Sequence, residues 1–247
     1  MKGTYLVTGA SSGIGRFLSL ELVNSGFTVI ALSRDSEHLR TLGKEIQKID
    51  SNSMIIACDL SSQDDIAKSC DMILDGCQEL SGIVHNAGVI DPIKPMSEAN
   101  FHDWNYLIQV NLLGVQDVTQ RLYQLIDGKK HTRVTTISSG ASKYPIGSWS
   151  AYCVSKAGLD MWTRCLAEEG QERNISAISV APGIVDTNMQ VNIRSSSPND
   201  FPLHPHFVDY HESGQLVDPE EVAKQLLDLV TNHTMEQTGE RFDVRDL

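Results

Sequence analysis

The amino-acid sequence predicts an α/β fold: one domain with a seven-stranded, mostly parallel sheet and helices on both faces. Short apolar runs rich in β-branched residues alternate along the chain with longer segments of helical periodicity. This alternation is typical of repeated strand–helix–strand units, which bury both faces of a parallel sheet. Hydrophobic residues make up 40% of the 247 positions, so a packed core is expected rather than disorder. No linker rich in Pro, Gly or Ser divides 1–247 into two cores.

The apolar and helical patterns also locate the individual elements. Strands are expected at 4–8, 28–33, 53–58, 82–86, 133–138, 175–181 and 241–244, and helices at 13–25, 36–49, 62–78, 98–128, 150–172 and 219–231. Ser36, and Pro219 after Asp218, are typical of helix starts.

The longest stretch without a regular pattern is 188–217. It contains serines at 195–197 and prolines at 198, 202 and 205, which oppose a long helix or strand. Irregular segments of this length in a compact domain are usually functional lids or disordered. We expect 188–217 to close over a substrate, with Val191, Ile193, Phe201 and Phe207 as an apolar roof, and a flexible surface loop without a role is the alternative.

Charge and hydropathy exclude several classes of function. The chain has 20 Lys and Arg against 32 Asp and Glu, a net charge of −12, whereas nucleic-acid binders are usually basic. No run of 18 apolar residues predicts a membrane span, and the first residues do not resemble a secretory signal. Five cysteines without a CxxC pair favour a reduced, cytoplasmic protein. No metal site is expected, because the histidines at 204, 206 and 211 lack completing ligands.

A glycine-rich turn follows the first expected strand, with Gly9, Gly13 and Gly15 in a G-x-x-x-G-x-G spacing. Gly9 would allow a tight turn, Gly13 a close approach of a pyrophosphate, and Gly15 close packing of helix on strand. The diphosphate would lie at the N-terminus of the next helix, whose free N–H groups and dipole attract anions. An ordinary glycine turn could contain the same residues, but the first strand–helix junction favours a dinucleotide site.

The end of the second expected strand bears on the choice of cofactor. It reads Ser33-Arg34-Asp35. An arginine is suited to bidentate capture of a ribose 2′-phosphate, so Arg34 favours NADP(H) over NAD. Asp35 is the competing feature, because an inward-facing carboxylate would repel the phosphate, and a solvated Arg–Asp pair is the alternative.

Three further residues suggest carbonyl chemistry. Tyr152 and Lys156 share a helix face, and Ser139 lies just past the fifth expected strand, where ligand sites of parallel sheets form. An ammonium near Tyr152 would lower its pKa from about 10. Tyr152 could then protonate a carbonyl oxygen while hydride arrives at the carbon, and Ser139 would orient that oxygen.

At these residues the chain resembles the short-chain dehydrogenase/reductase superfamily, in its compact single-domain branch, over essentially its whole length. The resemblance implies a Rossmann-like, doubly wound fold and a small-molecule carbonyl substrate. It also implies that Asn111, in the run VNLLG, is catalytic and anchors a water in a proton relay to Lys156. Asn86-Ala87-Gly88 resembles the family's NAG motif, although His85 replaces its usual first Asn.

The resemblance further implies cofactor contacts in several segments. Asp59-Leu60 corresponds to the adenine side, and 182–187 to the nicotinamide loop, with Thr187 and the Ile184 backbone on the carboxamide. The residues implied to bind NADP(H) are Gly9, Ser11, Ser12, Gly13, Ile14, Gly15, Ser33, Arg34, Asp59, Leu60, Asn86, Ala87, Gly88, Tyr152, Lys156, Pro182, Gly183, Ile184, Val185 and Thr187.

A narrower resemblance, at 138–158 and 181–196, is to sepiapterin reductases and benzil (diketone) reductases. It implies NADPH-dependent reduction of a vicinal diketone, an aromatic ketone or a pterin side-chain ketone. Asp243 aligns with the acidic residue that anchors the pterin in sepiapterin reductases, although a solvated strand-end carboxylate is the alternative. The substrate site would then comprise Ser139, Trp149, Tyr152, Met189 and Asp243, with simple core packing as the alternative for Trp149.

Two other functions stay open from the sequence. An NAD-dependent alcohol dehydrogenase would share the catalytic residues and differ at the cofactor's 2′ position. A non-catalytic nucleotide-binding protein would keep the glycine turn without the catalytic set. The family resemblance also implies a homodimer formed through the helices at 98–128 and 150–172.

Overall fold

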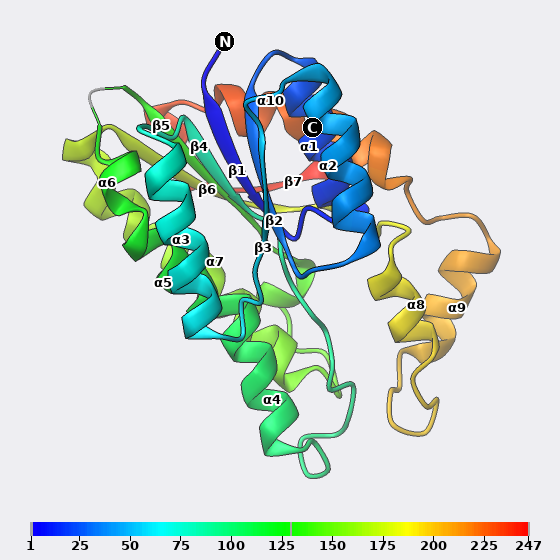
Figure 1. The fold of residues 1–247 in the computed structure, drawn as a ribbon. Helices are drawn as coiled ribbons and strands as arrows, with labels where there is room; N and C mark the ends of the chain where they lie inside the picture. Colours follow the sequence, from blue (N-terminus) through cyan, green and yellow to red (C-terminus); the bar gives the residue numbers. More distant parts are fainter. Residues whose placement is uncertain (1, 129, 247) are drawn as a thin grey trace.

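The computed structural model describes residues 2–128 and 130–246, which form one seven-stranded sheet in the order β3-β2-β1-β4-β5-β6-β7 (Figure 1). All the described pairings are parallel, so the fold prediction is confirmed. The strands are β1 Thr4–Thr8, β2 Thr28–Ser33, β3 Met54–Ala57, β4 Gly82–His85, β5 Thr132–Ile137, β6 Ile175–Ala181 and β7 Arg241–Asp243.

Two helical layers sandwich the sheet, with α1, α2 and α10 on one face and α3, α5 and α7 on the other (Figure 1). Successive residues of a strand point to opposite faces, and Tyr5 and Val7 accordingly pack in one core while Leu6 packs in the other. The helices are α1 Gly13–Asn24, α2 Glu37–Ile49, α3 Gln63–Gly76, α4 Phe101–Ile108, α5 Gly114–Arg121, α6 Tyr123–Ile126, α7 Ser150–Gly170, α8 Asn188–Arg194, α9 His204–Glu212 and α10 Pro219–Asn232.

The predicted helix starts follow from local capping. The Ser36 hydroxyl accepts a hydrogen bond from the Leu39 N–H at the start of α2. The Asp218 carboxylate accepts one from the Glu220 N–H at the start of α10, where Pro219 has no N–H to leave unpaired. Both starts predicted from the sequence are therefore confirmed.

Two segments differ from the sequence prediction. The helix expected over 98–128 is divided into α4, a π-helical turn at Gln109–Leu113, α5 and α6. A π turn inserts one extra residue into a helix, and here it contains the buried Asn111. The expected irregular loop at 188–217 contains two short helices, α8 and α9. Pro205 does not prevent α9 from forming, because it lies in the first turn of that helix, where proline is tolerated.

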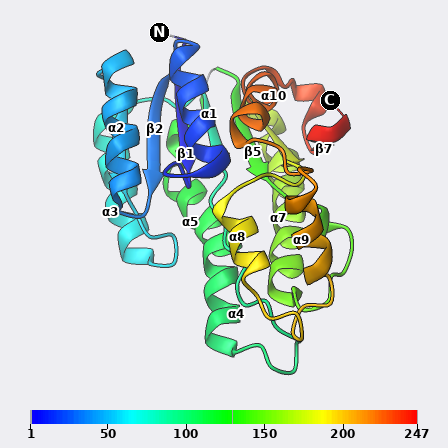
Figure 2. The ribbon, with the colours of Figure 1, turned by 90° about the vertical axis from the view of Figure 1, so that its right-hand side faces the viewer.

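The arm formed by α8 and α9 lies beyond the carboxyl ends of the strands, on the same side of the molecule as α4 (Figures 1 and 2). Asp200, between the two helices, forms an ion pair with Lys94 at 2.5 Å, and its carbonyl accepts a hydrogen bond from the Ser148 hydroxyl. Phe201 is fully buried and stacks on Trp149 at a ring-centroid distance of 5.1 Å. These contacts attach the arm to the segments that precede α4 and α7.

Candidate active site

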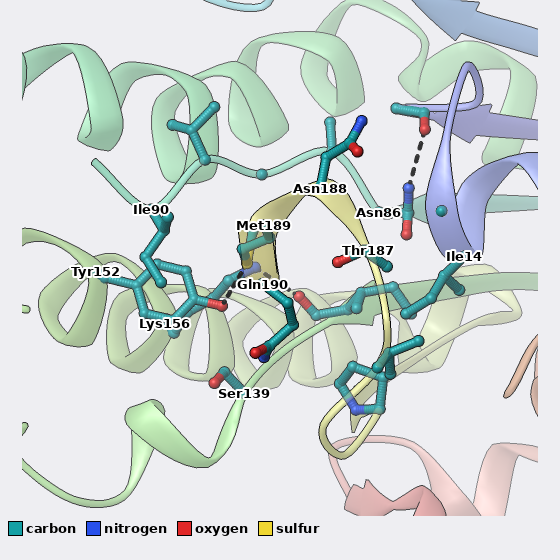
Figure 3. A pocket seen from close by; sticks show the side chains of 18 of the residues that line it. Ile14, Asn86, Ile90, Ser139, Tyr152, Lys156, Thr187, Asn188, Met189 and Gln190 are labelled. Atoms are coloured by element: carbon teal, nitrogen blue, oxygen red, sulfur yellow. Dashed lines mark hydrogen bonds between the residues drawn. The ribbon is translucent and has the colours of Figure 1, made fainter. Parts of the chain in front are cut away.

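A cavity of about 830 Å³ opens at the carboxyl ends of the parallel strands β1 and β4. From β1 the chain continues to β2 and β3 on one side of the sheet, and from β4 it continues to β5, β6 and β7 on the other side. This reversal of strand order is where open α/β sheets bind ligands. The glycine turn lines one end of the cavity, and Tyr152 and α8 line the other (Figure 3). All the residues implied to bind the cofactor line this cavity, apart from Gly15.

The glycine turn has the backbone geometry that a phosphate cradle needs. Gly9 and Gly13 have φ angles of 65° and 52°, a region that side-chain-bearing residues rarely adopt. A Cβ on Gly15 would lie 2.5 Å from the Gly9 oxygen, so Gly15 supports the turn from behind. Helix α1 begins at Gly13 with no side-chain cap and no acidic residue in its first turn. Its free N–H groups therefore face the cavity and can receive a pyrophosphate.

Asn86 and Thr8 hold the turn against the end of β4. Asn86 Nδ2 donates to the Thr8 carbonyl at 3.0 Å and to the Gly9 carbonyl at 3.3 Å. Thr8 Oγ1 accepts hydrogen bonds from the N–H groups of Asn86 and Ala87, both at 3.1 Å. Through these bonds the NAG segment keeps the turn rigid as well as lining the cavity.

His85, which replaces the family's usual asparagine, is buried behind this segment. Its Nε2 lies 2.9 Å from Thr119 Oγ1, whose own proton is donated to the Val115 carbonyl at 2.8 Å. The Thr119 oxygen can therefore accept, and His85 carries its proton on Nε2. Burial lowers the pKa of His85 to about 3, so the ring is neutral at physiological pH. Its position against Trp162 indicates a packing role.

The end of β2 shows how Arg34 and Asp35 differ. The Ser33 and Ser11 hydroxyls lie 2.8 Å apart and connect β2 to the glycine turn. Arg34 is exposed, lines the cavity and makes no ion pair with the described residues. Asp35 instead accepts two hydrogen bonds from Arg40. The positive group is thus free to meet a ligand, and the competing carboxylate is already paired.

Tyr152 and Lys156 lie in the first turns of α7, and both are buried. Lys156 Nζ donates a hydrogen bond of 2.7 Å to the Ile137 carbonyl at the end of β5, and it lies 5.8 Å from the centre of the Tyr152 ring. The Tyr152 hydroxyl contacts the Sδ of Met189 at 3.8 Å. The structure thus brings the predicted Tyr, Lys and Met together at one end of the cavity.

Asn111 does not line the cavity but lies directly behind it. Its Oδ1 accepts from the Val89 N–H and its Nδ2 donates to the Val89 carbonyl, both at 2.8 Å. A Cβ built on Gly88 would lie 3.5 Å from both Asn111 Oδ1 and Lys156 Nζ. The absence of a side chain at Gly88 therefore leaves these two polar atoms facing a common point.

The pKa of Tyr152 differs in direction from the sequence expectation. Burial raises it to about 12, and the nearby Ser139 hydroxyl acts in the opposite direction. Burial also lowers the pKa of Lys156 to about 8, with Asp160 opposing this change. Desolvation is the largest influence on the pKa of Tyr152, and the Lys156 ammonium donates its hydrogen bond to the Ile137 carbonyl rather than to the Tyr152 hydroxyl. Tyr152 is consequently a protonated phenol at neutral pH, which is the form that can act as an acid.

The end of the cavity near Tyr152 has an aromatic wall. Trp149 packs edge-on against Tyr152 at a ring-centroid distance of 5.5 Å, and it packs at a tilt against Phe207 at 5.4 Å. Ile193 and Phe207, expected in the apolar roof, line the cavity, whereas Phe201 is buried behind Trp149 and Val191 is 48% exposed. Tyr210, which the sequence did not suggest, completes this wall from α9.

Asp243 is not among the described residues that line the cavity. Its Oδ2 lies 2.6 Å from Arg245 Nη2, and this ion pair lowers the pKa of the carboxyl group. Arg245 lines the cavity instead, with its side chain beside Gly183. Gln190 also lines the cavity and was missed, because it belongs to a helix that the sequence did not predict.

Comparisons with known proteins agree with this geometry. Residues 4–198 match the family model for short chain dehydrogenases. The chain is 33% identical to a benzil reductase of Bacillus cereus, with 94% of this chain and 95% of the relative covered. A benzil reductase of Bacillus subtilis is 35% identical, with 98% of each chain covered. An NADPH-dependent pterin aldehyde reductase of Arabidopsis thaliana is 28% identical, with 75% of this chain and 76% of the relative covered.

Solved structures show the same relationship. A short-chain dehydrogenase/reductase of Saccharomyces cerevisiae superposes with a TM-score of 0.89 at 27% identity, covering 99% of this chain and 96% of that one. A short chain dehydrogenase of Escherichia coli complexed with NADPH gives a TM-score of 0.83 at 27% identity, covering 98% and 96%. The chain therefore belongs to the short-chain dehydrogenase/reductase family of oxidoreductases, with benzil reductases and a pterin aldehyde reductase among its relatives.

Proposed function

We propose that the protein is an NADPH-dependent carbonyl reductase that converts a vicinal diketone, an aromatic ketone or a pterin side-chain ketone to an alcohol. The observation that carries this proposal is the position of the Tyr152 hydroxyl. It lies at the aromatic-walled end of a cavity whose other end is a glycine turn suited to a dinucleotide. Such a cavity can hold a cofactor and an apolar carbonyl compound together.

The residues present fit NADP(H). The positive φ angles of Gly9 and Gly13 and the uncapped start of α1 suit the pyrophosphate. Arg34, free of ion pairs with described residues, can bind a 2′-phosphate with two parallel hydrogen bonds. NADPH would supply the hydride, and the chain's own residues would supply the proton and orient the substrate.

The site geometry supports a role of Tyr152 in proton transfer. Ser139 and Tyr152 would both donate hydrogen bonds to the carbonyl oxygen and so fix its position. With hydride supplied to the carbon, the C=O double bond would become a single bond, and the Tyr152 hydroxyl proton would move to the oxygen to give an alcohol. Lys156 would stabilise the resulting phenolate. Asn111 Oδ1 and Lys156 Nζ each lie 3.5 Å from the point that a Cβ of Gly88 would occupy, and this placement supports a route for reprotonation.

The substrate class is supported by the wall of the cavity and by the relatives. Trp149, Phe207 and Tyr210 offer ring faces and edges to an aryl group, and Met189 and Ile193 add apolar surface. Benzil, after which two relatives at 33% and 35% identity are named, is a diketone with two aryl groups. The relationship to a pterin aldehyde reductase is more distant, at 28% identity.

NADPH oxidation with a substrate panel tests the proposal. We expect turnover with benzil or isatin at a kcat/KM well above that for simple aliphatic ketones, and sepiapterin tests the pterin branch. The same panel with NADH should be slower. Preference for NADH, with alcohol oxidation but no dicarbonyl reduction, would instead support an NAD-dependent alcohol dehydrogenase. No turnover with any substrate and either cofactor would favour a non-catalytic nucleotide-binding protein.

A further inference from the structure

Gln190 has a buried side-chain oxygen that lacks a hydrogen-bond partner among the described residues. The residue is in the first turn of α8 and is 7% exposed, and its side-chain Oε1 makes no hydrogen bond with the described residues. Its backbone N–H is bonded to the Thr187 carbonyl at 2.9 Å, so the turn that carries the side chain is well defined. Native proteins seldom leave a buried amide oxygen unpaired, because its lost hydration is not compensated. Such a group therefore calls for an explanation.

The position of the side chain indicates where a partner would come from. Gln190 lines the same cavity as Ser139 and Tyr152. Figure 3 shows its amide extending from α8 toward Ser139 and the Tyr152 ring, whereas the Asn188 amide points away from them. The side chains of the neighbouring residues Met189 and Ile193 belong to the apolar cluster around Trp149 and offer no hydrogen-bond donor to the amide oxygen. A molecule bound in the cavity is thus the natural partner.

The same geometry favours the substrate over the cofactor. Thr187, which is expected to contact the nicotinamide, faces the glycine turn, since its Cγ2 would lie 3.0 Å from a Cβ on Gly13. Gln190 is directed to the opposite end, where the carbonyl oxygen would lie between Ser139 and Tyr152.

We propose that the Gln190 amide binds a second oxygen of the substrate, on the carbon next to the carbonyl that is reduced. This inference rests on the proposed carbonyl reductase function. A half-turn of the amide about its last side-chain bond exchanges its oxygen and nitrogen, so the group can donate an N–H to a carbonyl oxygen. Ser139 and Tyr152 then hold one oxygen of an α-dicarbonyl compound and Gln190 holds the other. Gln190 is therefore a specificity-determining residue that selects dicarbonyl compounds over monoketones.

The test compares two activated carbonyl compounds across three proteins. Benzil has a second oxygen next to the reacting carbonyl, and trifluoroacetophenone is an activated aryl ketone with one oxygen. The wild type, Gln190→Met and Asn188→Ala are assayed for kcat/KM with each at saturating NADPH. Met matches the length of Gln and removes the amide. Asn188 is the matched control, because its amide lines the same cavity but points away from Tyr152.

We expect Gln190→Met to lower the benzil-to-trifluoroacetophenone ratio of kcat/KM about tenfold, the effect of one lost hydrogen bond. The KM for NADPH should stay at the wild-type value, and Asn188→Ala should keep the wild-type ratio. Equal losses with both compounds, or a raised KM for NADPH, would overturn the assignment of Gln190 while leaving the carbonyl reductase function standing. A wild type that reduces trifluoroacetophenone but not benzil would also overturn it. Inactivity of the wild type toward every dicarbonyl and ketone would overturn the proposed function itself.

Discussion

Asp35 presents both carboxylate oxygens to the guanidinium of Arg40, at 2.7 and 2.8 Å. Both side chains are more than half exposed, so this pair adds little to stability and acts mainly on the local charge. The positive charge of Arg40 offsets the negative charge of Asp35, which would otherwise repel a phosphate at the end of β2. Arg34, one residue earlier, is left free to face the cavity.

Replacement of Arg34 tests this arrangement. Arg34→Ala should raise the KM for NADPH by about 10- to 150-fold, because one charge-assisted contact is lost. The KM for NADH should hardly change, since NADH has no 2′-phosphate. Arg40→Ala is the matched control: it releases Asp35 and should weaken NADPH binding by a smaller factor. Equal losses with both cofactors after Arg34→Ala would mean that Arg34 supports the loop instead.

Tyr152→Phe separates proton donation from cofactor binding. The variant lacks the proposed acid but keeps the buried ring, so turnover should fall by at least the roughly 10²–10⁴-fold that general acids contribute. NADPH binding, followed by cofactor fluorescence, should stay close to the wild-type affinity. Stopped-flow reduction at a near wild-type rate would show that the proton comes from another group.

The extent to which the sequence predicted the site differs between its two ends. The glycine turn, the serine after β5 and the Tyr–Lys pair are local patterns, and their spacing alone indicated that they meet at the strand ends. Gln190 and Tyr210 lie in α8 and α9. These helices were not predicted, because the serines and prolines of 188–217 indicated an irregular loop. A helix of seven residues that starts after a loop has too few turns to show a periodicity.

Two other features depend on tertiary structure. The π turn around Asn111 is stabilised by hydrogen bonds to Val89, far away in sequence. The raised pKa of Tyr152 follows from burial beneath Trp149 and α8, and no spacing of Tyr and Lys reports burial.

His85 predicts a pH dependence of stability. Its pKa is lowered to about 3 in the folded protein, against 6.5 for an unperturbed histidine. Well above pH 6.5, His85 is neutral in both the folded and the unfolded protein, so its protonation does not reduce the free energy of unfolding. As the pH falls below 6.5 the unfolded state takes up a proton that the folded state excludes, so stability declines by about 1.4 kcal/mol per pH unit.

Urea unfolding at pH 7 and pH 5 measures this effect. The wild type should lose about 2 kcal/mol more between these pH values than His85→Asn does. His102→Asn is the control, because His102 is largely exposed and should leave the wild-type pH dependence intact. An identical loss in wild type and His85→Asn would show that His85 is accessible to protons in the folded state. His233, whose pKa burial lowers to about 4, should add a second contribution of the same sign.

The homodimer expected from the family resemblance has a defined candidate surface. Leu113, Val154 and Met161 are each about half exposed, at 46%, 51% and 54%, on the segment after α4 and on α7. Light scattering at micromolar concentration should give twice the 27.2 kDa chain mass. Met161→Asp should shift the mass toward the monomer, because burial of an unpaired carboxylate opposes association. Met72→Asp, on α3, is the control. A wild-type mass near that of one chain would refute the dimer.

The last prediction concerns the arm at 188–217. It is attached through the ion pair of Asp200 with Lys94 and through Phe201 on Trp149, while Ile193 and Phe207 face the cavity. A ligand in the cavity would add contacts to α8 and α9, and so shift the arm toward the conformation seen here. Hydrogen exchange over 188–217 should therefore slow in a complex with NADP⁺ and benzil, relative to the free protein.

A variant distinguishes closure from general stabilisation. Asp200→Ala removes the ion pair with Lys94 but keeps the backbone carbonyl that Ser148 contacts. Exchange over 188–217 should be faster in this variant without ligand, and the KM for benzil should rise, because ligand binding must now order the arm as well. Exchange in α2, which is remote from the arm, should match the wild type. Unchanged exchange of the wild-type arm at saturating ligand would remove its role as a lid and leave the assignment of Tyr152 unaffected.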